Sequence, residues 1–195
     1  MTINIKDIKE LRDKTKAPMM TCKEALEENA GDFDKAVEWL KKKGALLAAK
    51  KADRDASEGV IASYVHSNNK IGVLLELSCE TDFVARNTEF KELAQEIAMQ
   101  VAASNPQYVK PEDVPDKELE NEREVIKEMF KKEKKPQKIL DKIAEGKLNK
   151  FKEEISLTKQ PLVKNPEMTV EELISEKTLK LGEKMEIKQF VRYEI

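Results

Sequence analysis

Apolar residues near the start of the chain recur at the three- and four-residue spacing of amphipathic helices. Asn4 and Asp7 are suited to cap a first helix. Thr21 and Glu24 form a T-x-x-E capping box, which predicts the start of a second helix, and Asp32 is expected to open a third. The predicted apolar stripes of the three helices are Ile5, Ile8 and Leu11; Cys22, Ala25, Leu26 and Ala30; and Phe33, Ala36, Val37 and Leu40.

The resulting three-helix bundle is expected to occupy residues 1–44, because Gly44 is placed to end the third helix. Residues 45–58 are rich in strong helix formers but carry little apolar stripe, which predicts a helical connector. From Val60 the apolar spacing changes to two, the period of a β-strand. Residues 59–195 are therefore assigned to a separate core domain.

The clearest strand pattern is "IGVLLELSC" at residues 71–79. A first strand, "VIASYVH" at 60–66, precedes it, and the polar gap "SNNK" contains asparagines that tolerate turn geometry. The two strands are therefore predicted to pair as a hairpin. The apolar residues expected on one face of the second strand are Ile71, Val73, Leu75, Leu77 and Cys79. A long amphipathic helix is expected next, with inward positions Phe90, Leu93, Ala94, Ile97, Ala98 and Val101.

The second half of the core is more highly charged. A helix is predicted over 117–134, followed by shorter helices at 139–144 and 148–155. Thr169 and Glu172 repeat the capping box and are expected to begin a further helix. The terminal segment again has strand character, with alternating Met185, Ile187, Val191, Tyr193 and Ile195. The whole pattern indicates an α+β fold, in which a helical N-terminal module precedes an antiparallel sheet core with packed helices.

Composition favours protein partners over nucleic acid. The chain has 195 residues, and its 36 Lys and Arg against 38 Asp and Glu give a net charge of −2. A near-neutral chain has no general attraction to nucleic acid, so no direct nucleic-acid partner is expected. The N-terminus has no apolar signal segment, and no apolar run approaches the length of a membrane span. We therefore expect a cytoplasmic protein without a membrane partner.

The residue patterns of common enzyme sites are missing from the sequence. It contains neither a P-loop nor a G-x-G-x-x-G motif, and Cys22, Cys79 and His66 have no metal-ligand spacing. We therefore expect no covalent catalysis, no cofactor and no metal site. The lysine run within 131–135 is suited to phosphate contact, but the interleaved Glu133 favours the end of an exposed helix.

The segment "CETDFVARN" at 79–87 joins the second strand to the long helix. It places an acidic and an aromatic residue, Asp82 and Phe83, side by side at this corner. From the pattern alone two interpretations stay open. In the first, Phe83 fills the local core and Asp82 caps the next turn. In the second, both residues form a rigid probe for a partner.

This segment resembles the signature of the elongation factor Ts family, the guanine-nucleotide exchange factors of elongation factor Tu. Residues 8–54 resemble the first module of that family, and "TVEELI" with "FVRYEI" resembles its C-terminus. The resemblance implies a ubiquitin-associated fold for the N-terminal module and exchange activity for the chain. It also implies that Thr81, Asp82, Phe83 and Val84 take part in displacing Mg²⁺ from elongation factor Tu.

The resemblance further implies a second docking surface, formed by Met19 and Met20 in a loop between helices, with Arg12 nearby. The family's short form has one copy of the core, as this chain does, and short members can pair. We therefore expect a homodimer and a two-plus-two complex with elongation factor Tu. The alternative function is a ubiquitin-associated adapter, which "GDFDKAVEWL" would suit by itself. Such an adapter has no evident need for the "TDFVARN" corner.

Overall fold

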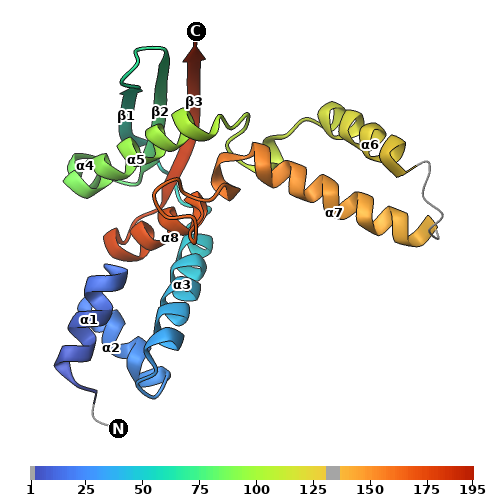
Figure 1. Ribbon diagram of the computed structural model, residues 1–195. Helices are drawn as coiled ribbons and strands as arrows, with labels where there is room; N and C mark the ends of the chain where they lie inside the picture. The colour runs from blue at the N-terminus through green and yellow to red at the C-terminus, as the bar shows by residue number, and fades with distance from the viewer. Residues whose placement is uncertain (1–2, 131–136) are drawn as a thin grey trace. The chain divides into compact units, whose positions relative to one another are not determined.

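The computed structural model describes residues 3–130 and 137–195 (Figure 1). It divides into two compact units, one formed by Met1–Met99 with Glu171–Ile195 and the other by Gln100–Val170. N-terminal helices are followed by a three-stranded antiparallel sheet and packed helices. The predicted α+β class is confirmed.

The N-terminal part of the first unit contains α1 (Ile5–Thr15), α2 (Met19–Glu28) and α3 (Phe33–Lys50). Two predicted caps are present: Asn4 Oδ1 accepts from Lys6 N at 3.0 Å, and Asp32 Oδ1 accepts from Lys35 N at 3.1 Å. The buried core of the three helices consists of Ile8, Leu11, Ala17, Cys22, Ala25, Leu26, Ala36 and Leu40. Most of the expected apolar stripes therefore pack together, but Ile5 and Ala30, which were predicted to face inward, are exposed, because Ile5 is the first residue of α1 and Ala30 lies just beyond the end of α2.

The capping box predicted at Thr21 and Glu24 is wrong, because the N-cap of α2 is Pro18, three residues earlier, and the helix begins at Met19. The Pro18 carbonyl already accepts the first helical hydrogen bond, from Cys22 N at 3.0 Å. Proline has a fixed φ and no N–H to satisfy, so it suits a helix start. Thr21 consequently lies inside the helix, and Met19 with Met20 belongs to its first turn.

The third helix does not end at Gly44 but continues to Lys50. Strong helix formers follow the glycine, and no residue that stops a helix stands among them. Gly44 instead permits a close approach to α8 (Val170–Leu181). A Cβ atom at this position would lie 3.1 Å from the carbonyl oxygen of Ser175.

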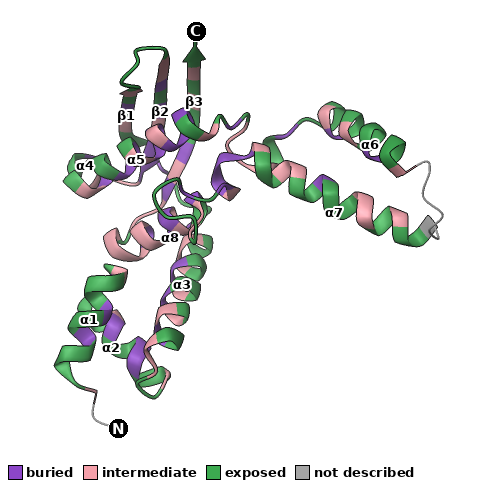
Figure 2. Cartoon of the chain, viewed as in Figure 1, coloured by how far each residue is buried: buried purple, intermediate pink, exposed green. Residues whose placement is uncertain are grey.

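The sheet consists of β1 (Glu58–Val65), β2 (Ile71–Cys79) and β3 (Met185–Glu194), in the order β1-β2-β3 with both pairings antiparallel. The predicted hairpin is confirmed. Helix α5 (Thr88–Ser104) crosses one face of the sheet, and the buried positions of helix and strands are visible in Figure 2. All six inward positions predicted for this helix are buried. The helix continues from the first unit into the second.

The apolar residues of β3 occupy both faces of the sheet because of a β-bulge. Ile187 pairs with Leu77 and Gln189 pairs with Glu76, so Lys188 is the extra residue. An extra residue reverses the side-chain alternation beyond it. Met185 and Ile187 are consequently buried, whereas Val191 and Tyr193 are 39% and 72% exposed.

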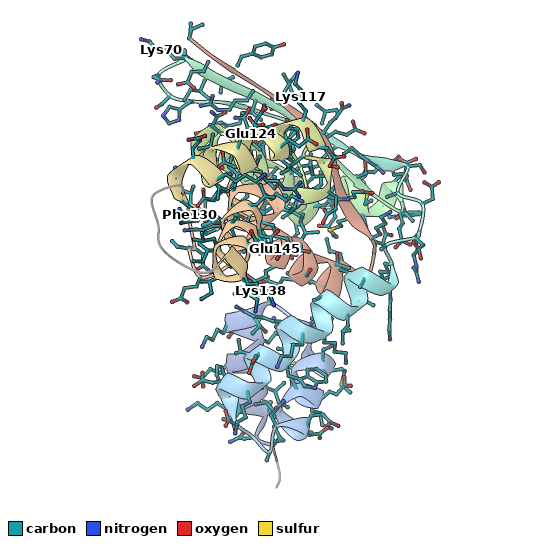
Figure 3. The ribbon with its side chains drawn as sticks, turned by 90° about the vertical axis from the view of Figure 1, so that its right-hand side faces the viewer. Lys70, Lys117, Glu124, Phe130, Lys138 and Glu145 are labelled. Carbon is teal, nitrogen blue, oxygen red and sulfur yellow. The ribbon has the colours of Figure 1, made fainter. Side chains whose placement is uncertain are left out.

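The second unit contains η1 (Pro111–Asp113), α6 (Asp116–Phe130), α7 (Gln137–Ile155) and η2 (Leu157–Lys159). Helices α6 and α7 pack along a buried strip of Val114, Leu119, Ile126 and Leu148. Figure 3 shows charged side chains on both helices, among them Glu124 on α6 and Glu145 on α7. The lysine run within 131–135 lies outside the described residues.

The two short helices predicted at 139–144 and 148–155 form one continuous helix, α7. Gly146, between them, does not interrupt it. A glycine in a helix costs only about 1 kcal/mol relative to alanine, which packing can offset. Ala144 and Leu148, one on each side of the glycine, both belong to the packed strip against α6.

The close packing around Gly59 in β1 gives a test of the fold. A Cβ atom at Gly59 would lie 2.3 Å from the carbonyl oxygen of Leu77 and 2.8 Å from Ser78 Cα. We expect Gly59→Ala to lower the free energy of unfolding by about 1–3 kcal/mol, measured by urea unfolding. Gly72→Ala is the matched control, because its Cβ would meet no heavy atom within 4 Å. Equal destabilisation by the two substitutions would contradict the β1–β2 register.

Candidate functional site

The corner between β2 and α5 forms a short helix, α4 (Asp82–Arg86), that presents Phe83 to solvent. Thr81 is its N-cap, and its hydroxyl accepts from Val84 N at 3.4 Å. Ala85 faces inward and is buried, while Phe83 is 82% exposed. Phe83 therefore does not fill the core, and the residue that caps the turn is Thr81 rather than Asp82.

Asp82 lies beside Phe83 and forms an ion pair with Arg86, one helical turn later, at 3.0 Å. Both side chains reach solvent, so the pair contributes little to stability. The Asp82 carboxylate can therefore leave Arg86 and bind a group of a partner protein at little energetic cost. The corner thus offers an apolar ring and an adjacent negative charge on one short helix.

Beneath this corner, the end of β2 is tightly packed. The Cys79 thiol is buried and donates to the carbonyl oxygen of Thr81, with a sulfur–oxygen distance of 3.2 Å. Burial, together with the negative charge of Glu183, raises the pKa of Cys79 to about 11. The thiol is therefore protonated at neutral pH and serves as packing and hydrogen-bond donor.

The second predicted set of residues lies on the N-terminal helices. Met20 is 72% exposed and Met19 is 37% exposed, both in the first turn of α2 rather than in a loop. Arg12 on α1 is also exposed. Burial raises the pKa of Cys22 in α2, and the Thr15 hydroxyl and the positive charge of Arg12 oppose that rise. The two predicted sets of residues thus belong to different elements, the methionine pair to α2 and Thr81–Val84 to α4 and its N-cap.

Two features of the site region escaped prediction from sequence. The Glu183 carboxylate accepts from Thr81 N just before α4, and the Glu80 carboxylate accepts from Lys184 N just before β3, so each contact joins residues more than 100 positions apart. The outer face of the sheet is apolar, with Ile61 67%, Leu74 50% and Tyr193 72% exposed. The unbroken apolar run at 73–75 is the signal that could have indicated this second face.

Within residues 3–130 and 137–195, no group of three or more His, Cys, Asp or Glu side chains is arranged to hold a metal ion. In the same part of the chain, every helix is too short or too polar to cross a membrane.

Comparison with known proteins identifies the family. The family model described as Elongation factor TS matches residues 4–195. The chain belongs to the elongation factor Ts family. Its members are guanine-nucleotide exchange factors of translation, which perform no covalent chemistry of their own.

Relatives named elongation factor Ts match the chain over nearly its whole length. The protein of Thermodesulfovibrio yellowstonii is 53% identical over 195 residues, covering 100% of this chain and 97% of the relative. That of Syntrophus aciditrophicus is 53% identical over 188 residues, covering 96% and 94%. That of Thermosipho melanesiensis is 53% identical over 193 residues, covering 99% and 98%. The similarity thus includes the N-terminal helices as well as the sheet.

Proposed function

We propose that this chain binds elongation factor Tu in the cytoplasm and accelerates GDP release by using the Asp82–Phe83 corner to displace Mg²⁺. The observation that carries the proposal is the 82% exposure of Phe83 on a short, capped helix. An exposed aromatic ring has no packing role in the free chain. It gains apolar burial only when a partner covers it.

The mechanism follows from linkage. A translational GTPase holds GDP through backbone N–H groups, a helix N-terminus and Mg²⁺. An exchange factor that binds the nucleotide-free form more tightly weakens nucleotide binding by the same factor. Phe83 supplies an apolar wedge and Asp82 a negative charge, while Thr81 and Val84 fix the helical turn that carries them. In this mechanism, Asp82 and Phe83 contact the form of elongation factor Tu from which Mg²⁺ has been displaced.

The N-terminal helices supply a separate docking surface in this proposal. Met19 and Met20 are adjacent, flexible and apolar, which suits an adaptable protein contact. The exposed Arg12, on the neighbouring helix α1, adds a positive charge. Residues 1–44 then act as a docking module, 45–58 as connector and 59–195 as the core that carries the exchange corner.

We also propose that the chain forms a homodimer, and with elongation factor Tu a two-plus-two complex. The outer face of the sheet presents Leu74 directly opposite Val191, with Ile61 and Tyr193 on the same face two register positions to either side of Leu74. Two copies related by a two-fold axis can bury this face against itself as two packed sheets. This chain has one copy of the core, so a second chain is the occupant that we propose for this face.

The adapter alternative is less well supported. The family similarity extends over residues 4–195, whereas an adapter function would involve the N-terminal helices alone.

The exchange reaction tests the proposed function directly. We expect the chain to accelerate release of a fluorescent GDP from elongation factor Tu, and excess Mg²⁺ to oppose it. Phe83→Ala and Asp82→Ala should each slow GDP release, by about tenfold for every ~1.4 kcal/mol of coupling free energy that the substitution removes. Because both side chains reach solvent, unfolding free energy should change by less than about 0.5 kcal/mol. Leu46→Ala, at a 63% exposed position on α3, is the control. Wild-type release rates in both variants would refute the mechanism.

The docking surface has its own test. We expect Met19→Asp with Met20→Asp to weaken the complex with elongation factor Tu in titration calorimetry, because a desolvated charge replaces apolar contact. Helicity should be unchanged, since acidic residues are favourable in the first turn of a helix. Ile5→Asp is the matched control, an exposed apolar residue in the first turn of α1. Unchanged affinity of the double variant would exclude this surface.

The oligomeric state is tested by light scattering at micromolar concentration. We expect twice the chain mass of 22.3 kDa, and a shift to the monomer mass in Leu74→Glu, which places a charge in the apolar face. Leu46→Glu, at an exposed position outside the sheet, should leave the dimer intact. A wild-type monomer mass would rule out the dimer.

A further inference from the structure

Two glutamate side chains, Glu80 and Glu183, each accept a hydrogen bond from the backbone beside the other glutamate. These contacts lie where the chain leaves β2 for α4. The Glu183 carboxylate accepts from Thr81 N at 3.0 Å and from Thr81 Oγ1 at 2.6 Å. The Glu80 carboxylate accepts from Lys184 N at 2.6 Å. Each carboxylate thus holds the backbone N–H of the residue that follows the other glutamate. We call this arrangement the reciprocal clamp.

The clamp lies just outside the strand ladder. The last paired residues of β2 and β3 are Cys79 and Met185, so the sheet's own hydrogen bonds end there. Glu80 and Thr81 follow the end of β2, and Glu183 and Lys184 precede the start of β3. The clamp therefore extends the pairing of the two segments up to the first residue before α4.

The same contacts set the start of α4. The Thr81 hydroxyl donates its hydrogen to Glu183 and at the same time accepts from Val84 N. Glu183 therefore fixes the direction of the hydroxyl that caps the helix carrying Asp82 and Phe83. Helix α4 has five residues, too few to hold its geometry by its own hydrogen bonds.

A buried lysine that directly follows α3, Lys51, completes the arrangement. Lys51 is 7% exposed, and its Nζ donates to the Gly182 carbonyl at 2.6 Å and lies 3.6 Å from Glu80. Arg54 pairs with the other oxygen of Glu80 at 3.1 Å. The Lys184 N–H, with the help of Arg54 and Lys51, lowers the pKa of Glu80 below its usual value. The carboxylate is therefore ionised throughout the neutral range.

We propose that Glu183 and Glu80 are positioning residues for nucleotide exchange, which hold α4 so that Phe83 and Asp82 meet the GTPase in a fixed orientation. This inference rests on the proposed function of that corner. Neither glutamate needs to touch the partner. Their effect on exchange arises through Thr81 and the first turn of α4, since a probe that can tilt loses part of its contact with the nucleotide-free form.

Glu183 offers a charge-matched pair of variants. Glu183→Ala removes both hydrogen bonds to Thr81, whereas Glu183→Gln removes the charge but keeps an acceptor for the Thr81 N–H. We expect the alanine variant to lower the maximal rate of fluorescent GDP release about tenfold, and the glutamine variant to stay within about threefold of wild type. Affinity for elongation factor Tu should change less than the maximal rate, because residues 1–44 still dock.

Alkylation of the two free cysteines reports the local structure in the same proteins. Cys79 lies directly beneath Thr81, and Cys22 is buried in the N-terminal helices. We expect Glu183→Ala to increase the alkylation rate of Cys79 relative to Glu183→Gln, with Cys22 unchanged. The comparison between the two variants cancels the effect of losing the Glu183 charge on the Cys79 pKa. Equal acceleration at both cysteines would indicate general loosening and would overturn the positioning role.

Failure of this inference is distinguishable from failure of the proposed function. If Phe83→Ala slows exchange but Glu183→Ala does not, the corner is the probe and the clamp does not position it. If neither variant slows exchange, the corner itself has no role, and the inference falls with it. Slowed exchange in both, with selective exposure of Cys79 in Glu183→Ala, supports the clamp.

Discussion

Helix α4 is too short to exist alone, and the exchange role that we propose for it depends on what holds it in place. Five residues cannot offset the entropy of forming a first helical turn in water. The helix is stabilised by the Thr81 cap at one end and by buried Ala85 on its inner side. These contacts place a large aromatic side chain in solvent without a flexible loop. Phe83 contributes little to folding because it is exposed, so in the proposed mechanism its apolar surface contributes to binding instead.

The sequence pattern predicted the parts of this fold that follow local periodicity. The alternation in 71–79 correctly identified the buried face of β2, and the spacing of 90–101 identified the buried face of α5. The Asp82–Phe83 corner was also visible, as a polar interruption between two strongly patterned elements, but the pattern left open whether Phe83 was buried or exposed. Each of these features depends on residues that are close together in the sequence.

The features that were missed depend on competing local signals or on distant partners. Thr21 and Glu24 match the capping-box pattern, but the hydrogen bond from Cys22 N to the Pro18 carbonyl begins the helix before Thr21. The bulge at Lys188 moved Val191 and Tyr193 to the outer face, and periodicity alone does not show an extra residue. The pairing of Glu80 with Lys184 joins residues 104 positions apart, so only the folded sheet brings them together.

The central claim is that the Phe83 contacts are made with the nucleotide-free form of elongation factor Tu. The most direct measurement is the affinity of wild type and Phe83→Ala for two preparations of the partner, one nucleotide-free and one loaded with GDP and Mg²⁺. We expect the substitution to weaken binding to the nucleotide-free form by about tenfold, which corresponds to ~1.4 kcal/mol, and to leave binding to the loaded form unchanged. Equal weakening of both affinities would contradict the claim, because a contact shared by both forms cannot drive release of nucleotide.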